Sequence, residues 1–118
     1  MARYIDAIII PVPTKKMKIY TAIAKKTAKA WIKYGALECV KTVADDVLKG
    51  KVTSFPRSVK LKSTETVVFT YIVYKSRAHR EQVFTKMMKD ESVMKLWDEI
   101  PCDGMRMIFG GFKSIVAV

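Results

Sequence analysis

Three charged side chains fall at positions where the sequence predicts little contact with water. Asp6 is the single acid of the apolar run 4–10, Arg80 lies early in a helical segment, and Arg106 stands near the start of the last apolar segment. An acid and an arginine that are buried together form either a structural ion pair or a polar anchor for a ligand. We expect Asp6 and Arg106 to meet, with Arg80 completing a cationic site for a carboxylate-bearing ligand.

Three more residues are candidates for the same site. Ser54 and Phe55 lie in an irregular segment long enough to cover a pocket. His79 is the only histidine, at the start of a predicted helix, where a structural role and a ligand-binding role are both open. No G-x-S-x-G elbow accompanies the serines, which argues against a hydrolase, and the catalytic residues stay unassigned.

Two cysteines, Cys39 and Cys102, lie far apart and outside any C-x-x-C motif. With one histidine they cannot form the usual zinc site, so no metal and no cofactor is expected. Free thiols are typical of a reducing cytoplasm, which is the expected location. No apolar run approaches the roughly 20 residues of a membrane helix, and the run that ends at Pro11 is too short for a signal peptide.

The net charge of +11 is concentrated in one part of the chain. Residues 14–62 contain 13 Lys and Arg against three acids, whereas the rest of the chain is nearly neutral. Lys25, Lys29 and Lys33 are spaced to share one side of a helix and could bind nucleic acid or an acidic partner. A solvated lysine-rich helix face explains the same pattern, since no aromatic platform is interleaved with the lysines.

The first half of the chain predicts a strand, a helix and a second strand. The strand covers 4–10 and is stopped by two prolines, which cannot donate backbone hydrogen bonds. A helix capped by Thr14 then runs to Tyr34 and ends at Gly35. Its apolar side is given by the spacing of Tyr20, Ala24 and Trp31. A strand follows over 36–43, and 44–62 is an irregular loop.

The second half begins with the most informative stretch, 66–74, whose two alternating sets of side chains are both largely apolar. Successive strand side chains point to opposite faces, so both faces of this strand need covering. A helix capped by Ser76 covers 77–89, a short helix 90–99, and a last strand 105–118 with a bulge or bend at Gly110-Gly111.

This order predicts one α+β domain over residues 1–118, a ferredoxin-like βαββαβ fold. Two helices cover one face of a four-stranded antiparallel sheet. The opposite sheet face remains apolar, and two such faces meeting across a symmetry axis would give a dimeric α/β barrel.

Five stretches of the sequence occur together in one family: WIKYGALE at 31–38, GKVTSFP at 50–56, ETVVF at 65–69, SRAHR at 76–80 and DGMRMIFGGF at 103–112. In this combination the chain resembles the YbaA-like family of bacterial proteins, within the dimeric α/β-barrel superfamily. The resemblance spans 4–116 and implies the fold and a homodimer, but no reaction, since none is established for the family. The superfamily includes cofactor-independent monooxygenases and haem-degrading enzymes. His79 is the only candidate for the axial histidine that haem degradation would require.

Two functions follow as hypotheses. The first is a homodimer that binds a small organic ligand in the barrel, with or without cofactor-free oxidative chemistry. Its apolar lining would come from Tyr4, Trp31, Tyr71, Tyr74 and Phe112, each of which also suits an ordinary core. The second is a module that binds nucleic acid or an acidic partner through the lysine-rich segment, with binding that falls steeply as salt rises.

Overall fold

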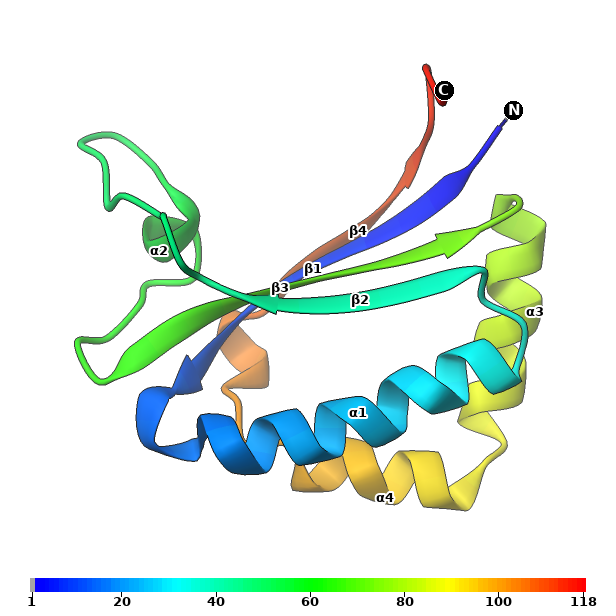
Figure 1. Ribbon diagram of the computed structural model, residues 1–118, viewed down its shortest axis with the longest axis horizontal. Coiled ribbons are helices and arrows are strands. Elements are labelled where there is room, and N and C mark those ends of the chain that lie inside the picture. Colours follow the sequence, from blue (N-terminus) through cyan, green and yellow to red (C-terminus); the bar gives the residue numbers. More distant parts are fainter. Residues whose placement is uncertain (1) are drawn as a thin grey trace.

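The computed structural model describes residues 2–118 and contains one four-stranded antiparallel sheet in the order β2-β3-β1-β4. The strands are β1 (Tyr4–Pro13), β2 (Glu38–Val43), β3 (Glu65–Tyr74) and β4 (Ile108–Lys113). Helices α1 (Met17–Lys33), α3 (Arg77–Met88) and α4 (Glu91–Glu99) cover one face of the sheet (Figure 1). The predicted α+β, ferredoxin-like architecture is therefore confirmed.

The first strand runs three residues further than predicted and includes both prolines. The Thr14 amide donates to the Thr64 carbonyl beyond the end of β3, and alternate amides of a strand point the same way. The nitrogens of Pro11 and Pro13 therefore face the side of β4. The first residue of β4, Ile108, pairs with Ile9, so β4 does not extend alongside the two prolines. Prolines are tolerated where a strand has a free edge, so they do not stop β1.

The ends of the helices show which local signals the fold uses. Ser76 caps α3 as predicted, accepting a hydrogen bond of 3.1 Å from the His79 amide. Thr14 makes no such side-chain bond, so the predicted cap is wrong, and a 3₁₀ turn over Thr14–Lys16 leads into α1. At the other end of α1, Gly35 has φ +117°, the left-handed conformation expected there.

The last strand is shorter than predicted and has no bulge. Gly110 pairs with Ala7 and Gly111 with Asp6 in an unbroken ladder. A side chain at Gly111 would collide with the phenol ring of Tyr4, which lies over this position. Gly111 is therefore required by a close approach to a neighbouring side chain, and the bend predicted from the two glycines is wrong.

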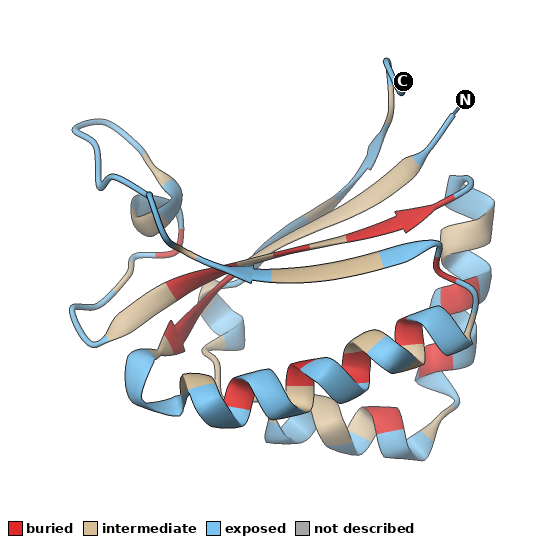
Figure 2. Ribbon diagram, viewed as in Figure 1, coloured by how far each residue is buried: buried red, intermediate tan, exposed pale blue. Residues whose placement is uncertain are grey.

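The core lies between the sheet and the helices. Val68, Ile72 and Tyr74 of β3 are fully buried there, together with Val83 and Met87 of α3. Trp31 of α1 packs edge-on against Tyr74 and is stacked with Phe84 and close to Trp97. Buried residues lie along β3 and on the side of α1 that faces the sheet (Figure 2).

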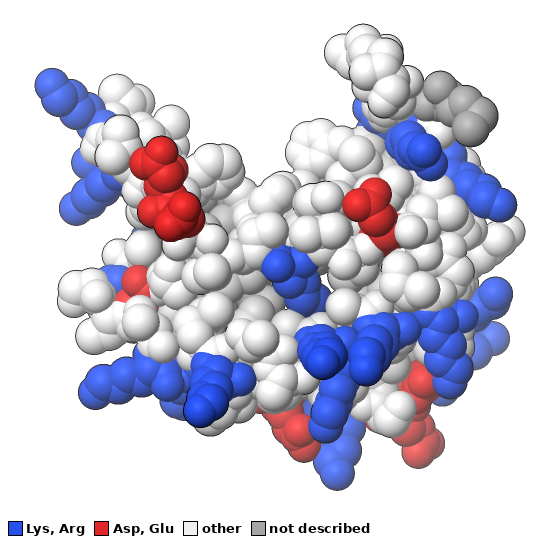
Figure 3. Space-filling model, viewed as in Figure 1, with Lys and Arg blue, Asp and Glu red and all other residues white. Residues whose placement is uncertain are grey.

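The basic side chains lie mainly on the helical layer (Figure 3). Helix α1 contains no acidic residue, and its lysines are all exposed: Lys18, Lys25, Lys26, Lys29 and Lys33. Within residues 2–118 the salt bridges involve arginines only, so these lysines are not neutralised by carboxylates. No helix in the described part of the chain has the length and apolar character needed to cross a membrane.

Candidate ligand-binding face

One face of the sheet is not covered by α1, α3 or α4, and we call it the open face. Strand alternation and the register of the pairs place these side chains on it: Ile5, Ala7, Ile9 and Pro11; Val40 and Thr42; Val67, Phe69, Tyr71 and Val73; Ile108 and Phe112. Phe112 is 60% exposed and Ile108 42%. Pro11, Val67 and Val73 are already buried within the subunit, and the exposed Glu38 lies on the same face at the edge strand β2. Exposed apolar side chains such as Ile108 and Phe112 are the usual mark of an interaction or ligand site.

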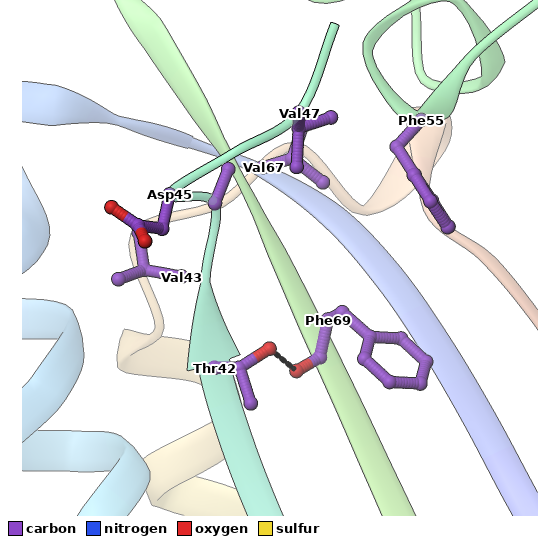
Figure 4. A pocket seen from close by; sticks show the side chains of 8 residues that line it. Thr42, Val43, Asp45, Val47, Phe55, Val67 and Phe69 are labelled. Carbon is purple, nitrogen blue, oxygen red and sulfur yellow. Dashed lines mark hydrogen bonds between the residues drawn. The ribbon is translucent and has the colours of Figure 1, made fainter.

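The segment between β2 and β3 rises over one end of the open face (Figure 1). It contains the short helix α2 (Phe55–Ser58), and we call residues 44–64 the arch. Between arch and sheet lies a cavity of about 180 Å³, with Val47 and Phe55 on the arch side and Thr42 and Phe69 on the sheet (Figure 4). Its lining is completed by Val43, Ala44, Asp45 and Val67. The cavity is thus mainly apolar, with the Thr42 hydroxyl on the sheet side, while the Asp45 carboxylate points away from Phe55 and Phe69 (Figure 4).

The arch is held by backbone-directed hydrogen bonds. The Ser54 side chain caps α2 by accepting from the Arg57 amide at 3.1 Å, and the Arg57 guanidinium donates to the Gly50 carbonyl at 2.9 Å. Gly50 has φ +66°, which an L-residue rarely adopts. Ser54 therefore shapes the arch from within, whereas Phe55 points toward the cavity.

Arg106 fixes the far end of the arch to the sheet. Its guanidinium donates to the Lys60 carbonyl at 2.9 Å and pairs with Glu65 at 2.6 Å and with Asp103 at 2.8 Å. The Glu65 side chain is only 7% exposed. The bonds from Arg106 hold the pKa of Glu65 below its usual range, and Glu65 in turn raises the pKa of Arg106. This network ties β3 to the arch and to the turn before β4.

The predicted meeting of Asp6 and Arg106 is wrong. Asp6 pairs in the sheet with Gly111, whereas Arg106 precedes β4 and lies beside Glu65, which pairs with Pro13 at the opposite end of β1. The order of strands makes the first and last strands neighbours, but it does not fix how far along the strand each charge lies.

Asp6 is paired with Arg80 instead, on the helix-covered side of the sheet. The Arg80 guanidinium reaches the Asp6 carboxylate at 2.9 and 3.1 Å, and the Tyr74 hydroxyl donates to Asp6 at 3.0 Å. Burial, followed by the nearby Asp6 charge, raises the pKa of Tyr74, while the bond to Asp6 raises the pKa of Arg80. The Asp6 carboxylate therefore already accepts hydrogen bonds from Arg80 and Tyr74 in the free protein, which is the arrangement of a structural ion pair.

His79 lies next to this cluster without joining it. Its Nδ1 accepts the Lys75 amide at 3.0 Å, and its ring packs edge-on against Tyr74. The six candidate residues thus divide between two places: Asp6, His79 and Arg80 lie where β1 begins, and Ser54, Phe55 and Arg106 lie at the arch. Of the six, only Phe55 lines the apolar cavity.

Sequence reasoning missed the other side chains around the cavity, because the arch gives no periodic signal that would place Val47 above Phe69. It also missed a second hollow of about 570 Å³ at the other end of the sheet. That hollow is lined by Arg3, Lys75, Arg77 and Lys113 among others. These four cations come from three separate segments and form no recognisable motif.

Comparison with solved structures places the fold among known α+β proteins. SnoaB from Streptomyces nogalater, a cofactor-independent oxygenase, superimposes with a TM-score of 0.64 at 8% identity, covering 98% of this chain and 96% of that one. A dimeric ferredoxin-like protein from an uncultured marine organism gives a TM-score of 0.57 at 15% identity, covering 100% and 98% of the two chains. At these identities the likeness shows the fold alone.

Comparison of sequences is more specific. Residues 3–104 match the family model described as a protein of unknown function, DUF1428. The uncharacterized protein YbaA of Escherichia coli K12 is 40% identical over 114 residues, which covers 97% of either chain, and the Shigella flexneri protein of the same name matches equally well. The resemblance to YbaA-like proteins is thereby confirmed, and the chain belongs to the DUF1428 family of proteins of unknown function.

Proposed function

We propose that the protein is a cytoplasmic homodimer that binds a small organic ligand between two open faces, in the cavity under the arch. The observation that carries this proposal is the cavity itself. It is mainly apolar and lies on the sheet face opposite α1, α3 and α4, beneath a segment held in place by Arg57 and Arg106. Two free cysteines are consistent with a reducing compartment.

The shape of the open face supports pairing with a second copy. The arch and the C-terminal segment both rise on this side of the sheet, one at each end (Figure 1). A second sheet laid between them would remove Phe69, Ile108 and Phe112 from water. Burying apolar surface contributes about 25 cal/mol per Å², so removing these aliphatic and aromatic side chains from water would favour dimerisation. The marine protein of similar fold is described as dimeric.

The lining defines the class of ligand. Val47, Val67, Phe55 and Phe69 suit an aliphatic or aromatic group. The Thr42 hydroxyl already donates to the Phe69 carbonyl at 2.7 Å, so toward a ligand it can only accept a hydrogen bond (Figure 4). The cavity of about 180 Å³ is smaller than the roughly 300–1,000 Å³ of drug-sized sites. It therefore suits a molecule of about one ring, or one end of a larger molecule that the partner subunit also contacts. Since SnoaB is a cofactor-independent oxygenase, oxygen uptake is the first activity to measure once a ligand is known.

Native mass spectrometry of freshly purified protein tests the proposal. We expect a dimer carrying a small extra mass that persists at high salt. Val47→Trp, which fills the cavity, should remain dimeric and lose that mass. Val52→Trp is the matched control, because Val52 lies in the same arch, is 92% exposed and does not line the cavity. An empty wild-type dimer, or a mass that Val47→Trp retains, would contradict ligand binding under the arch.

A second function, nucleic-acid binding, is favoured by the row of unneutralised lysines on α1. Replacing Lys25, Lys29 and Lys33 with Gln should then weaken binding to single-stranded oligonucleotides. The fall of log K with log salt should become less steep, its slope changing by about 2–3 toward zero. Fluorescence anisotropy at several salt concentrations measures this. The control variant replaces Lys86 of α3, Lys89 at the C-terminal end of α3 and Lys95 of α4, which removes the same charge from other helices. Equal losses in both triple variants would show that α1 is not the binding surface.

A further inference from the structure

We propose that the second hollow, at the end of the sheet beside the chain ends, binds a small molecule that carries a diphosphate group. Its volume of about 570 Å³ falls within the roughly 300–1,000 Å³ that is usual for small-molecule sites. It lies at the opposite end of the sheet from the cavity under the arch, and the proposal does not rest on that cavity.

Four cations from three separate segments line this hollow, which we call the cationic hollow: Arg3, Lys75, Arg77 and Lys113. In the sheet Tyr4 pairs with both Tyr74 and Lys113, which brings together the start of β1, the end of β3 and the end of β4. Basic side chains gather beside the chain ends at this end of the molecule (Figure 3). The concentration of charge therefore results from the tertiary fold, and not from a lysine-rich stretch of sequence.

No carboxylate neutralises these four cations in the part of the chain that the structure describes. The lining includes no Asp or Glu, and every salt bridge among residues 2–118 belongs to Arg80 or Arg106. Asp6, which pairs in the sheet with Gly111 of the lining, is already bound by Arg80. Like charges that share one hollow repel one another, so a bound anion relieves this repulsion.

The backbone beneath the cations is fixed by hydrogen bonds. The Arg3 amide donates to the Ser114 hydroxyl at 2.8 Å, and the Ser114 amide donates back to the Arg3 carbonyl at 2.9 Å. The Lys75 amide donates to Nδ1 of His79 at 3.0 Å, so the histidine holds the turn that presents Lys75 to the hollow. A site whose backbone is already ordered loses less conformational freedom when a ligand binds.

The number and kind of the cations favour a diphosphate. A single phosphate group carries a charge of about −1.5 to −2 at pH 7, which matches two cations, whereas two linked phosphate groups can engage all four. Arg3 and Arg77 offer planar guanidinium groups that bind phosphate oxygens in pairs, while Lys75 and Lys113 act as point charges. The cations converge on one hollow, whereas a nucleic-acid backbone needs them along a line, which favours a small molecule.

Isothermal titration calorimetry with inorganic pyrophosphate, the simplest diphosphate, tests the proposal at constant ionic strength. We expect one site per subunit and an affinity about tenfold above that for inorganic phosphate, since more charged groups are engaged. Uridine diphosphate distinguishes the two sources of the group. Tighter binding than pyrophosphate assigns the site to diphosphate esters, and equal or weaker binding assigns it to free pyrophosphate. Failure of the wild type to bind pyrophosphate, or an affinity no higher than that for phosphate, would overturn the proposal.

A pair of double variants separates the cationic hollow from the overall charge of the protein. Lys75→Gln with Lys113→Gln should weaken pyrophosphate binding about tenfold or more, because two charge-assisted contacts are lost. Lys86→Gln with Lys95→Gln is the matched control, since it removes the same charge from exposed helical positions outside the hollow. Differential scanning fluorimetry checks that both variants fold. Equal losses of affinity in the two variants would mean that pyrophosphate responds only to net charge, which contradicts the assigned site.

Discussion

Phe69→Lys should convert the proposed dimer into a folded monomer. Phe69 lies on β3, a central strand, and faces the middle of the open face between Ile9 and Thr42. In a face-to-face dimer the substitution would bury two like charges near each other, one from each sheet. A buried charge without a partner costs several kcal/mol, so the dissociation constant should rise by roughly a thousandfold or more. Sedimentation velocity over a range of protein concentrations measures the change.

Ile32→Lys is the matched control for this experiment. Ile32 is 48% exposed on α1, on the opposite side of the sheet, and the substitution adds the same side chain. We expect it to remain dimeric. Far-UV circular dichroism should show that both variants are folded. If Ile32→Lys dissociates and Phe69→Lys does not, the subunits associate through the helical layer and the proposed barrel is wrong.

The fold was predictable because its decisive signals are local. Residues 65–74 show their two apolar faces in the sequence, and Ser76 and Gly35 mark helix ends by chemistry that needs no distant partner. The errors occur where a distant residue decides the outcome. Gly111 is required because Tyr4, far away in the chain, lies over it. Pro11 is tolerated because the pairing of β1 with β4 stops at Ile9.

The site was less predictable for the same reason. Arg80 was expected to join Asp6, and the two side chains do form an ion pair. Arg106 was expected to reach Asp6 as well, but it anchors the arch instead. The cavity depends on how the arch folds back over Phe69, and an irregular segment carries no repeat from which that contact could be read. Phe55 was a candidate only because it lies in an irregular segment long enough to cover a pocket.

Arg106→Met should lower the melting temperature by about 10 °C or more and expose the arch to proteolysis. The substitution preserves much of the side-chain volume but leaves the Glu65 carboxylate, 7% exposed, without its cation. Removing one partner of a buried ion pair is more damaging than replacing both. The Lys60 carbonyl also loses its donor, so the arch is released from the turn before β4. Differential scanning fluorimetry and limited proteolysis measure the two effects.

Two further variants separate the ion pair from the arch. Arg57→Met removes bonds within the exposed arch only, so it should loosen the arch with little change in melting temperature. Adding Glu65→Gln to Arg106→Met removes the unpaired charge and should recover part of the lost stability. Failure of this double variant to recover any stability would show that the charge of Glu65 is not the cause.

The lowered pKa of Glu65 determines how the stability contributed by Arg106 changes with pH. Arg106 holds the pKa of Glu65 below its ordinary value of about 4.3, so the folded state binds fewer protons than the unfolded state as pH falls through that value. The stability contributed by the pair is therefore fully present above about pH 4.3 and is lost as pH falls through the lower, folded pKa. The difference in melting temperature between wild type and Arg106→Met should be largest near pH 7 and should shrink below pH 4. A difference that stays constant between pH 7 and pH 3.5 would mean that Arg106 acts through packing and its bonds to the arch. If the difference shrinks as expected, the charge pairs of Arg106 with Glu65 and Asp103, both of whose carboxyl pKa values Arg106 lowers, are what hold the arch above the cavity.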